Sequence, residues 1–422
     1  MNKGADAGTR TPDPFITSEV LYQLSYVGGA RPVYPRASVL FRATSGDLAV
    51  AYRPPMPRGW ARLDVGDPLS RIQPALWSAA FFVWLYDWGF AVRHQGSDGT
   101  IILAGFRRFI HHEPVYTAPT NGGTFNHFPS ELLVLSPIGE LPAAAGRFVI
   151  VTLSIALFVA AVMRLARRSP YAALLVLTAG LAAPVTQELS EQNVDLLAAG
   201  LVGLALAADR RRSQCVLLFL GLAIKPTVWP VAFALGLPGV GVLAAVAAAN
   251  GIALLLVAHG SRFFTEVLPF LSHGQAAIEH VARTSIADAL RELHAPNAVA
   301  VAVATLLLIA TVAYLVRLTS PKTRDAAPLL IVASLLFASY AFAIYTVYVI
   351  ATAPLLRIRP LMPDLIVTGV AAYLVGTNDS WWTPSAPAAR YVVAVAALLV
   401  LGVRGLRTAR DAEYRWQERV RT

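Results

Sequence analysis

Long apolar runs separated by short polar segments occupy most of the chain. A helix that crosses a membrane needs about 20 mostly apolar residues, or fewer where it lines a cavity or is interrupted. Runs of this kind span residues 74–92, 144–165, 170–186, 194–208, 214–235, 239–258, 296–316, 327–356, 363–376 and 388–403. The pattern therefore predicts an all-α, polytopic membrane protein.

Two of these runs do not suit a single straight helix. The stretch "KPTVWP", Lys225–Pro230, interrupts the run 214–235, and proline removes a backbone donor and clashes with the preceding turn. We expect two short helices that meet at Lys225. The run 327–356 is too long for one ordinary crossing, so we divide it near residues 342–345. These divisions bring the expected number of membrane helices to about twelve.

The composition also indicates a membrane protein. Of the 422 residues, 56% are hydrophobic and only 14% are charged, whereas soluble chains usually carry about 25% charged residues. The net charge of +10 does not indicate a nucleic-acid partner, because the basic residues cluster between the apolar runs. The expected partner is the lipid bilayer. The single cysteine, Cys215, lies in an apolar run and excludes an intramolecular disulfide.

The basic clusters predict the orientation, because lysine and arginine concentrate in cytoplasmic loops. They comprise Arg58, Arg62, Arg71, Arg164, Arg167, Arg168, Arg210, Arg211, Arg212, Arg317, Lys322, Arg324, Arg404, Arg407 and Arg410. Placing all of them in the cytoplasm gives a multi-pass protein of the plasma membrane with both termini inside. The acidic segments 95–99, 187–193, 259–295 and 376–382 then lie outside, together with the break at Lys225.

Domain boundaries follow from the same pattern. Residues 74–404 form one expected membrane domain, with a cytoplasmic segment 56–73 before it and a basic cytoplasmic tail 405–422 after it. Residues 1–55 contain neither a long apolar run nor a signal-peptide pattern. Their stretch "LYQLSY" can be encoded by CTCTACCAACTGAGCTAT, whose reverse complement resembles the D-arm of a transfer RNA gene. We therefore expect 1–55 to be either disordered or not native protein, with the true start near Met56.

A carboxylate and a short amphipathic segment follow the first apolar run. Asp98 precedes "TIILAGFRRFI", residues 100–110, which places apolar residues on one face and Arg107 and Arg108 on the other. Such a helix lies in the membrane interface. Asp98 could instead be a solvated residue that only caps this helix. Asp87, inside the first run, is a secondary candidate, because an intramembrane acid usually faces a cavity or a cation.

A second segment is expected in the same outer interface. The stretch "FNHFPSELLVLSPIGELP", residues 125–142, has an apolar core that is too short and too rich in proline to cross the bilayer. His127 and Glu131 would then face the same water layer as Asp98. Taken alone, His127 is interpreted as a hydrogen-bonded structural residue rather than a base or a ligand.

Two further polar features belong to the outer side. The stretch "EQNVD", residues 191–195, opens the fourth run with polar groups. Lys225 lies at membrane depth beside unwound backbone, which makes it a candidate phosphate-binding residue, although it could also be a snorkelling lysine. No histidine, cysteine or acidic motif has the spacing of metal ligands, so neither a metal nor another cofactor is expected.

These residues suit a lipid-linked phosphate as substrate. A phosphate near Lys225 would leave its apolar tail in the bilayer and extend its head toward Asp98. A carboxylate there could accept a proton from an attacking hydroxyl, which typically accelerates a reaction about 10²- to 10⁴-fold. The phosphate would then be the leaving group.

Five sequence features in order resemble those of integral-membrane glycosyltransferases of the GT-C class, specifically glycosyltransferase family 87. They are Asp98 after the first span, "AGFRRFIHHEPVY", "FNHFPSELLVLSPIGELP", "EQNVDLL" and "LGLAIKPTVWP". The family typically shows an acid after the first span, then "G.DPY", "F.YPP..LL..P...LP", "GQ.N.LL" and "LGLA..LKP". The resemblance covers about residues 74–374.

Three segments narrow the resemblance within the family. Residues 261–275, 339–356 and 369–382 are most similar to the actinobacterial cell-wall arabinofuranosyltransferase type that introduces α-1,3 branches. The resemblance implies an inverting transfer of arabinofuranose from a polyprenyl-phosphate donor to a glycan or glycolipid acceptor of the cell envelope. It implies an active site on the extracytoplasmic side, no nucleotide and no required metal.

The resemblance also assigns roles to residues. It gives the general-base role to Asp98. The candidate donor-binding residues are Lys225, Gln192, Asn193 and His127, and the secondary candidates are Asp87, Glu131, Tyr345 and Tyr348. Glu113 stands where the aspartate of "DPY" is expected, and tyrosines stand where many relatives carry a tryptophan and a histidine. These departures concern the identity of the sugar more than the reaction class.

Other functions remain open. A mannosyltransferase of the same family would use polyprenyl-phosphate mannose. A transporter or lipid flippase would also place charges along a cavity, but the chain shows neither matched halves nor symmetric broken helices. The sequence does not indicate an oligomeric state.

Overall fold

The computed structural model describes residues 68–94, 96–116, 125–167, 169, 171–269, 284–320, 323–339, 341, 343–358, 361–376 and 388–421. All regular secondary structure in this part of the chain is helical, which confirms the all-α prediction. The expectations for residues 1–67, and for the outer segments at 270–283 and 377–387, lie outside the described residues.

Among the described residues, five helices are long and apolar enough to cross a membrane. They are α2 (Pro68–Arg93), α5 (Ala143–Ala166), α10 (Leu237–Leu256), α13 (Asn297–Thr319) and α17 (Ala388–Arg421). A sixth candidate span is the pair α6 (Ala172–Gly180) and α7 (Ala183–Glu191), which is bent by 51°. These helices confirm a polytopic membrane protein, whereas the total of about twelve crossings stays a prediction.

Shorter helices complete the bundle. The α-helices are α3 (Ser97–Ile110), α4 (Pro129–Leu135), α8 (Asp195–Ala207), α9 (Arg211–Ile224), α12 (Ile286–Glu292), α14 (Ala327–Leu336), α15 (Val347–Thr352) and α16 (Met362–Gly376). The 3₁₀ segments are η1 (Ser136–Glu140), η2 (Pro226–Leu235), η5 (Thr323–Ala326), η6 (Ala343–Thr346) and η7 (Ala353–Leu355), and η3 (Phe263–Val267) is a π-helical turn.

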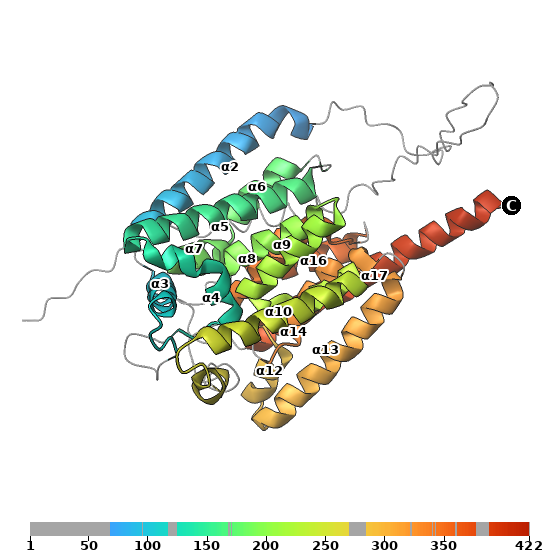
Figure 1. The fold of residues 1–422 in the computed structure, drawn as a ribbon. Helices are drawn as coiled ribbons and strands as arrows, with labels where there is room; N and C mark the ends of the chain where they lie inside the picture. The colour runs from blue at the N-terminus through green and yellow to red at the C-terminus, as the bar shows by residue number, and fades with distance from the viewer. Residues whose placement is uncertain are drawn as a thin grey trace, which may run out of the picture.

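The short apolar helices lie inside the bundle and the long ones surround them. Figure 1 shows α2 and α13 at opposite edges, with α8 and α14 between them. Every residue of α14 is buried, as expected for a helix that is apolar on all sides. The outer helices instead expose large apolar side chains such as Phe82, Leu255 and Leu306, at 65%, 87% and 67%. Such outward apolar surfaces suit contact with lipid.

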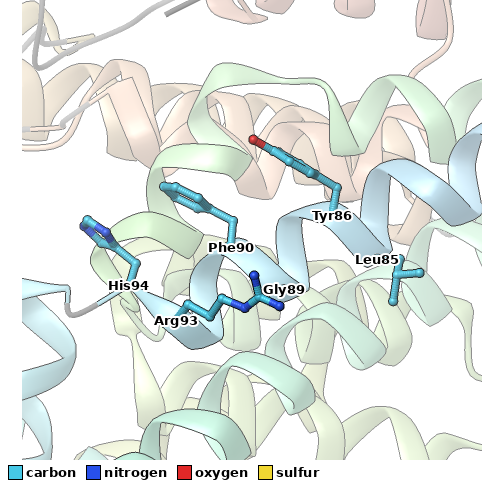
Figure 2. A pocket seen from close by; sticks show the side chains of 6 residues that line it. All are labelled: Leu85, Tyr86, Gly89, Phe90, Arg93 and His94. Atoms are coloured by element: carbon cyan, nitrogen blue, oxygen red, sulfur yellow. The ribbon is translucent and has the colours of Figure 1, made fainter. Parts of the chain in front are cut away.

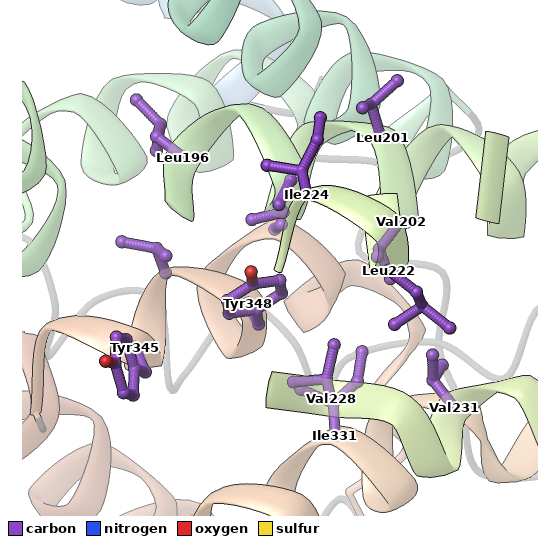
Figure 3. Packing of buried hydrophobic residues seen from close by; sticks show 14 of the residues in the cluster. Leu196, Leu201, Val202, Leu222, Ile224, Val228, Val231, Ile331, Tyr345 and Tyr348 are labelled. Atoms are coloured by element: carbon purple, nitrogen blue, oxygen red, sulfur yellow. The ribbon is translucent and has the colours of Figure 1, made fainter. Parts of the chain in front are cut away.

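The core lies where α8, α9, η2, α14 and α15 meet. Figure 3 shows Leu196, Ile224, Val228, Ile331 and Tyr348 converging there, and all five side chains are buried. On the other face of α8, Gly200 lets the helix approach α5 closely, because an added Cβ would lie 2.7 Å from the carbonyl carbon of Leu157.

Some boundaries differ from the sequence predictions. The break at Lys225 is confirmed, because α9 ends at Ile224 and η2 begins at Pro226. Residues 187–191, predicted as part of an outer loop, instead belong to α7. The last helix continues far beyond residue 403, to Arg421. In Figure 1 its C-terminal part projects from the end of the bundle opposite to α3 and α4.

Candidate active site

Two helix junctions that are distant in sequence pack against each other. The α2–α3 junction contacts the end of α7 through Gly96, where an added Cβ would lie only 2.4 Å from the carbonyl oxygen of Glu191. Only glycine allows this approach. The hydroxyl of Ser97 also donates a 2.7 Å hydrogen bond to the Glu191 carboxylate. The first residues of α3 are thereby held against the α7–α8 junction.

Gln192 is the residue that fastens these junctions. It ends α7 in the left-handed region, with φ of 57°, and its amide binds the carbonyl of Leu189 while the next amide, of Asn193, binds that of Glu188. This is a Schellman turn, in which glycine is the usual residue. The Gln192 side chain donates hydrogen bonds of 2.6 and 2.7 Å to the carbonyl oxygens of Ala91 and His94, at the end of α2.

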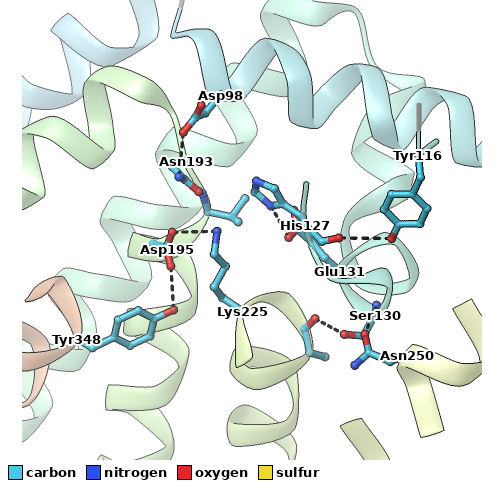
Figure 4. Close-up of polar contacts among 12 residues, drawn as sticks. Asp98, Tyr116, His127, Ser130, Glu131, Asn193, Asp195, Lys225, Asn250 and Tyr348 are labelled. Carbon is cyan, nitrogen blue, oxygen red and sulfur yellow. Dashed lines mark hydrogen bonds and ion pairs between the residues drawn. The ribbon is translucent and has the colours of Figure 1, made fainter. Parts of the chain in front are cut away.

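Asn193 connects this turn to the candidate base. Its side-chain oxygen accepts a bond from the amide of Val194 at 2.7 Å, and its Nδ2 donates to Oδ2 of Asp98 at 3.0 Å. Asp98 lies in the first turn of α3, whose N-terminus has no side-chain cap bond. The carboxylate therefore contacts the α7–α8 junction rather than capping its own helix. The Asp98–Asn193 contact is visible in Figure 4.

Lys225 reaches the same junction from the break between α9 and η2. Its backbone is extended, as favoured for a residue that precedes proline. The Ser130 hydroxyl donates a 2.6 Å bond to the carbonyl of Ala223, one of the carbonyls that the end of α9 leaves unpaired within the helix. The side chain of Lys225 is only 12% exposed, and its ammonium lies 3.2 Å from Oδ2 of Asp195.

Asp195 joins three elements. It is fully buried in the first turn of α8, and its other oxygen accepts a 3.2 Å hydrogen bond from the hydroxyl of Tyr348 on α15. The ring centroid of Tyr345 lies 5.8 Å from the ammonium of Lys225. Both tyrosines, which the sequence analysis treated as secondary candidates, therefore border the Lys225–Asp195 pair.

His127 and Glu131 form a second buried pair. The imidazole Nδ1 lies 2.7 Å from Oε2 of Glu131, and the two side chains are 6% and 0% exposed. The hydroxyl of Tyr116 donates to the backbone carbonyl of His127 at 3.4 Å. The expectation that both residues face a water layer was wrong, because α4 packs between α9 and α10 instead of lying on the surface. Figure 4 shows both pairs in one view.

The electrostatic environment of Asp98 combines burial with several charges. Burial raises the pKa of its carboxyl group above the ordinary value. Interactions with His127 and Lys225 lower this pKa, whereas those with Glu191 and Asp195 raise it. The net effect is a raised pKa, which makes the carboxylate a better proton acceptor than a solvated aspartate.

The remaining candidate, Asp87, lies away from the contacts described above. It belongs to the buried stripe of α2 together with Ala80, Trp84 and Ala91, and it is 8% exposed. Its Oδ2 has no hydrogen-bond partner among the described residues. The opposite face of α2 carries a groove of about 460 Å³, which includes Arg93 and His94 at its end (Figure 2). None of the predicted site residues lines this groove.

Asp195 and Glu188 are both buried at the α7–α8 junction, and neither was named as a candidate from the sequence. Asp195 was visible as the last letter of "EQNVD", and its place beside other polar residues at the start of an apolar run was the available signal. Glu188 was assigned to a loop, so its burial could not be predicted. Among the described residues, no group of three or more histidine, cysteine, aspartate or glutamate side chains could hold a metal ion.

Comparison with known proteins identifies the family. The profile of the family described as Glycosyltransferase family 87 matches residues 125–346, more than half of the chain. No curated protein and no solved structure matches this chain. The matched range includes His127, Asn193, Asp195 and Lys225, and it begins after Asp98. The chain belongs to glycosyltransferase family 87 and is a membrane glycosyltransferase.

Proposed function

We propose that this enzyme transfers a sugar from a polyprenyl-phosphate donor to a hydroxyl group of a cell-envelope glycan, with Asp98 as general base and Lys225 as phosphate-binding residue. One observation carries the proposal. Asp98 and Lys225 come from distant parts of the sequence, yet both bind the short stretch Asn193–Asp195, at 3.0 and 3.2 Å. A proton acceptor and a cation are thus available on two sides of one junction.

The reaction would be a single displacement. Asp98 takes the proton of the acceptor hydroxyl while the hydroxyl oxygen attacks the anomeric carbon of the donor. The bond between that carbon and the phosphate oxygen breaks, and its electron pair leaves with the polyprenyl phosphate. Attack opposite to the leaving group inverts the anomeric configuration. The raised pKa of Asp98 supports its role, because the pKa of an efficient base lies near the working pH.

Lys225 would stabilise the leaving group. The phosphodiester of the donor carries one negative charge, and the phosphate monoester that departs carries up to two. A fixed cation beside the oxygen that gains this charge stabilises the transition state more than the ground state. The Lys225 side chain is only 12% exposed and its ammonium is oriented by Asp195, so little reorganisation is needed.

The sugar is proposed to be arabinofuranose, with mannose as the alternative within the family. The segment most similar to the arabinofuranosyltransferases includes Tyr345 and Tyr348. Both lie beside the Lys225–Asp195 pair, so a difference in these side chains would act directly on the donor site.

The site is proposed to open on the extracytoplasmic side. The C-terminal part of α17, which continues past Arg404, Arg407 and Arg410 to Arg421, projects from the end of the bundle opposite to α3 (Figure 1). Because basic residues concentrate on the cytoplasmic side, this separation supports an outward-facing Asp98 and a cytoplasmic C-terminus.

The test is transfer by purified protein in liposomes. Radiolabelled polyprenyl-phosphate arabinose and polyprenyl-phosphate mannose are supplied beside oligosaccharide acceptors, and the products are subjected to linkage analysis. We expect an arabinosylated product from the wild type, none from Asp98→Asn, and near-normal transfer by Thr100→Ala, an exposed position on the same helix. Full turnover by Asp98→Asn would remove Asp98 from the base role. Transfer from polyprenyl-phosphate mannose but not from polyprenyl-phosphate arabinose would refute arabinofuranose as the transferred sugar.

A further inference from the structure

Glu188 is a buried acid that has no role in the reaction described so far. It lies on α7, in the turn before Gln192, and its side chain is 1% exposed. Neither Oε1 nor Oε2 has a hydrogen-bond partner among the described residues. Its backbone carbonyl, in contrast, accepts the amide of Asn193 at 3.1 Å, so its position is set by the turn that also places Asn193.

The carboxyl group of Glu188 acts on the charged residues of the candidate active site. It interacts electrostatically with Asp195, Lys225 and Asp98. It also acts on Tyr348, the residue that donates a hydrogen bond to Asp195. Glu188 is therefore close enough to the proposed base, the proposed phosphate-binding residue and Asp195 for their charges to interact.

A second buried acid, Asp288, has the hydrogen-bond and ion-pair partners that are expected of a structural carboxylate. Asp288 on α12 is also 1% exposed. It accepts hydrogen bonds from the Ser285 hydroxyl at 2.6 Å and the Ala341 amide at 3.2 Å, and it forms an ion pair with Arg291 at 2.8 Å. Native proteins rarely leave a buried polar group unpaired, because its lost hydration is then uncompensated. Glu188 lacks these compensations, so fold stability does not explain its presence.

We propose that Glu188 binds a hydroxyl group of the donor sugar. This inference rests on the proposed function, because it assumes a polyprenyl-phosphate sugar whose phosphate lies at Lys225. The sugar is attached directly to that phosphate, so its hydroxyl groups would lie near Lys225, Asp195 and Glu188. A sugar hydroxyl donates to a carboxylate and accepts from a carboxylic acid, so it satisfies Glu188 in either state.

Other ligand classes fit the site less well. A second phosphate would be repelled by Asp98, Glu191 and Asp195, which act on Glu188 as neighbouring negative charges. A metal ion lacks support, because no suitable group of three ligands exists among the described residues. A neutral ligand rich in hydroxyl groups is the class that remains.

The experiment compares Glu188→Leu and Glu188→Gln with Thr186→Val, which changes an exposed residue of the same helix. Initial rates are measured in liposomes with intact polyprenyl-phosphate arabinofuranose and with donors that each lack one hydroxyl group. Loss of a hydrogen bond to a charged group corresponds to about 10- to 100-fold in kcat/KM. We expect a loss of this size for Glu188→Leu with the intact donor, and little change for Thr186→Val.

The deoxy donors distinguish direct contact from an indirect effect. For the wild type, one deoxy donor should lose about 10- to 100-fold in kcat/KM, and for Glu188→Leu the same deletion should have little further effect, because the partner is already gone. Equal losses in both proteins for every deoxy donor would overturn the inference while leaving the proposed function intact. A wild type that uses no polyprenyl-phosphate sugar would instead refute the proposed function and Glu188's role together.

Thermal unfolding without donor provides a second readout. Replacing an unpaired buried carboxyl group should leave Tm unchanged or raise it, as is common where a binding residue is held at the expense of stability. A marked fall in Tm for both Glu188 variants, with normal donor KM in the folded fraction, would show a structural role and overturn the inference.

Discussion

The side-chain Nδ2 of Asn193 donates a 3.0 Å hydrogen bond to the carboxylate of Asp98, across 95 positions of sequence. This contact joins α3 to the α7–α8 junction. Asp195, two residues after Asn193, forms an ion pair with Lys225. The position of Asn193 therefore determines the distance between the proposed base and the proposed phosphate site.

Asn193→Ala should lower activity by misplacing Asp98. The variant removes the donor that orients the carboxylate, and a hydrogen bond to a charged group corresponds to about 1.5–3 kcal/mol, or roughly 10- to 100-fold in kcat/KM. Transfer rates in liposomes, together with membrane protein levels, measure the effect. Asn193→Asp should be worse, because it places a like charge beside Asp98. Equal activity of Asn193→Ala and the wild type would contradict this positioning role.

The pH dependence of transfer should reflect the environment of Asp98. Only the deprotonated carboxylate can accept a proton, so kcat/KM should rise with pH through the raised pKa of Asp98 and reach a plateau above it. The rise should therefore occur at higher pH than for an ordinary aspartate. Profiles of kcat/KM against pH in liposomes of constant composition provide the measurement.

Lys225→Met should shift the pH profile of kcat/KM to higher pH. Lys225 lowers the pKa of Asp98, and its loss also leaves the negative charge of Asp195 unpaired, which raises that pKa further. The acid limb should move to higher pH, in addition to any loss of donor affinity. A limb that stays in place or moves to lower pH would show that Asp98 does not control it.

Gln192 should show a distinctive order of stability among its variants. Gln192→Ala loses the bonds to Ala91 and His94 and keeps a side chain in the left-handed region, whereas Gln192→Gly loses the same bonds but relieves that strain. Since the strain is about 1–2 kcal/mol, the glycine variant should be the more stable of the two by about that amount. Thermal unfolding in detergent measures the difference. The reverse order would contradict the left-handed conformation.

The apolar runs predicted most of the helices because a segment within the bilayer must be both apolar and helical, whether it faces lipid or protein. The run 144–165 became α5, Ala143–Ala166, and the proline after Lys225 placed the break correctly. Local chemistry was sufficient in both cases, since chain length and a missing backbone donor depend only on neighbouring residues.

Contacts between distant segments could not be predicted in the same way. Residues 187–191 look like a polar loop, but they form the end of α7 because Gln192 and Glu191 contact the α2–α3 junction. The buried position of α4 depends on Asn250, whose side chain accepts the amide of Ser130 across 120 positions. Neither partner can be identified from one sequence, so the outer segments were placed on the surface.

Tyr348→Phe tests whether the hydrogen bond from Tyr348 to Asp195, the partner of Lys225, contributes to both protein stability and donor binding. The hydroxyl is fully buried and donates to Asp195, so its loss leaves a buried carboxylate with one partner fewer, at about 1–3 kcal/mol of unfolding free energy. Tyr314→Phe is the matched control, because the Tyr314 hydroxyl also contacts a charged group, Arg407, but does so at an exposed position, where the change should be below about 1 kcal/mol.

The kinetic consequence of Tyr348→Phe separates two roles of Asp195. If Asp195 mainly orients the ammonium of Lys225, loss of the hydroxyl lets the carboxylate rotate, and the donor KM rises while the acceptor KM is unchanged. If Asp195 only balances charge, the ion pair survives and neither KM moves, although Tm still falls. Measuring both KM values beside Tm for Tyr348→Phe and Tyr314→Phe distinguishes the two, because a general loss of folded protein lowers the rate without changing either KM.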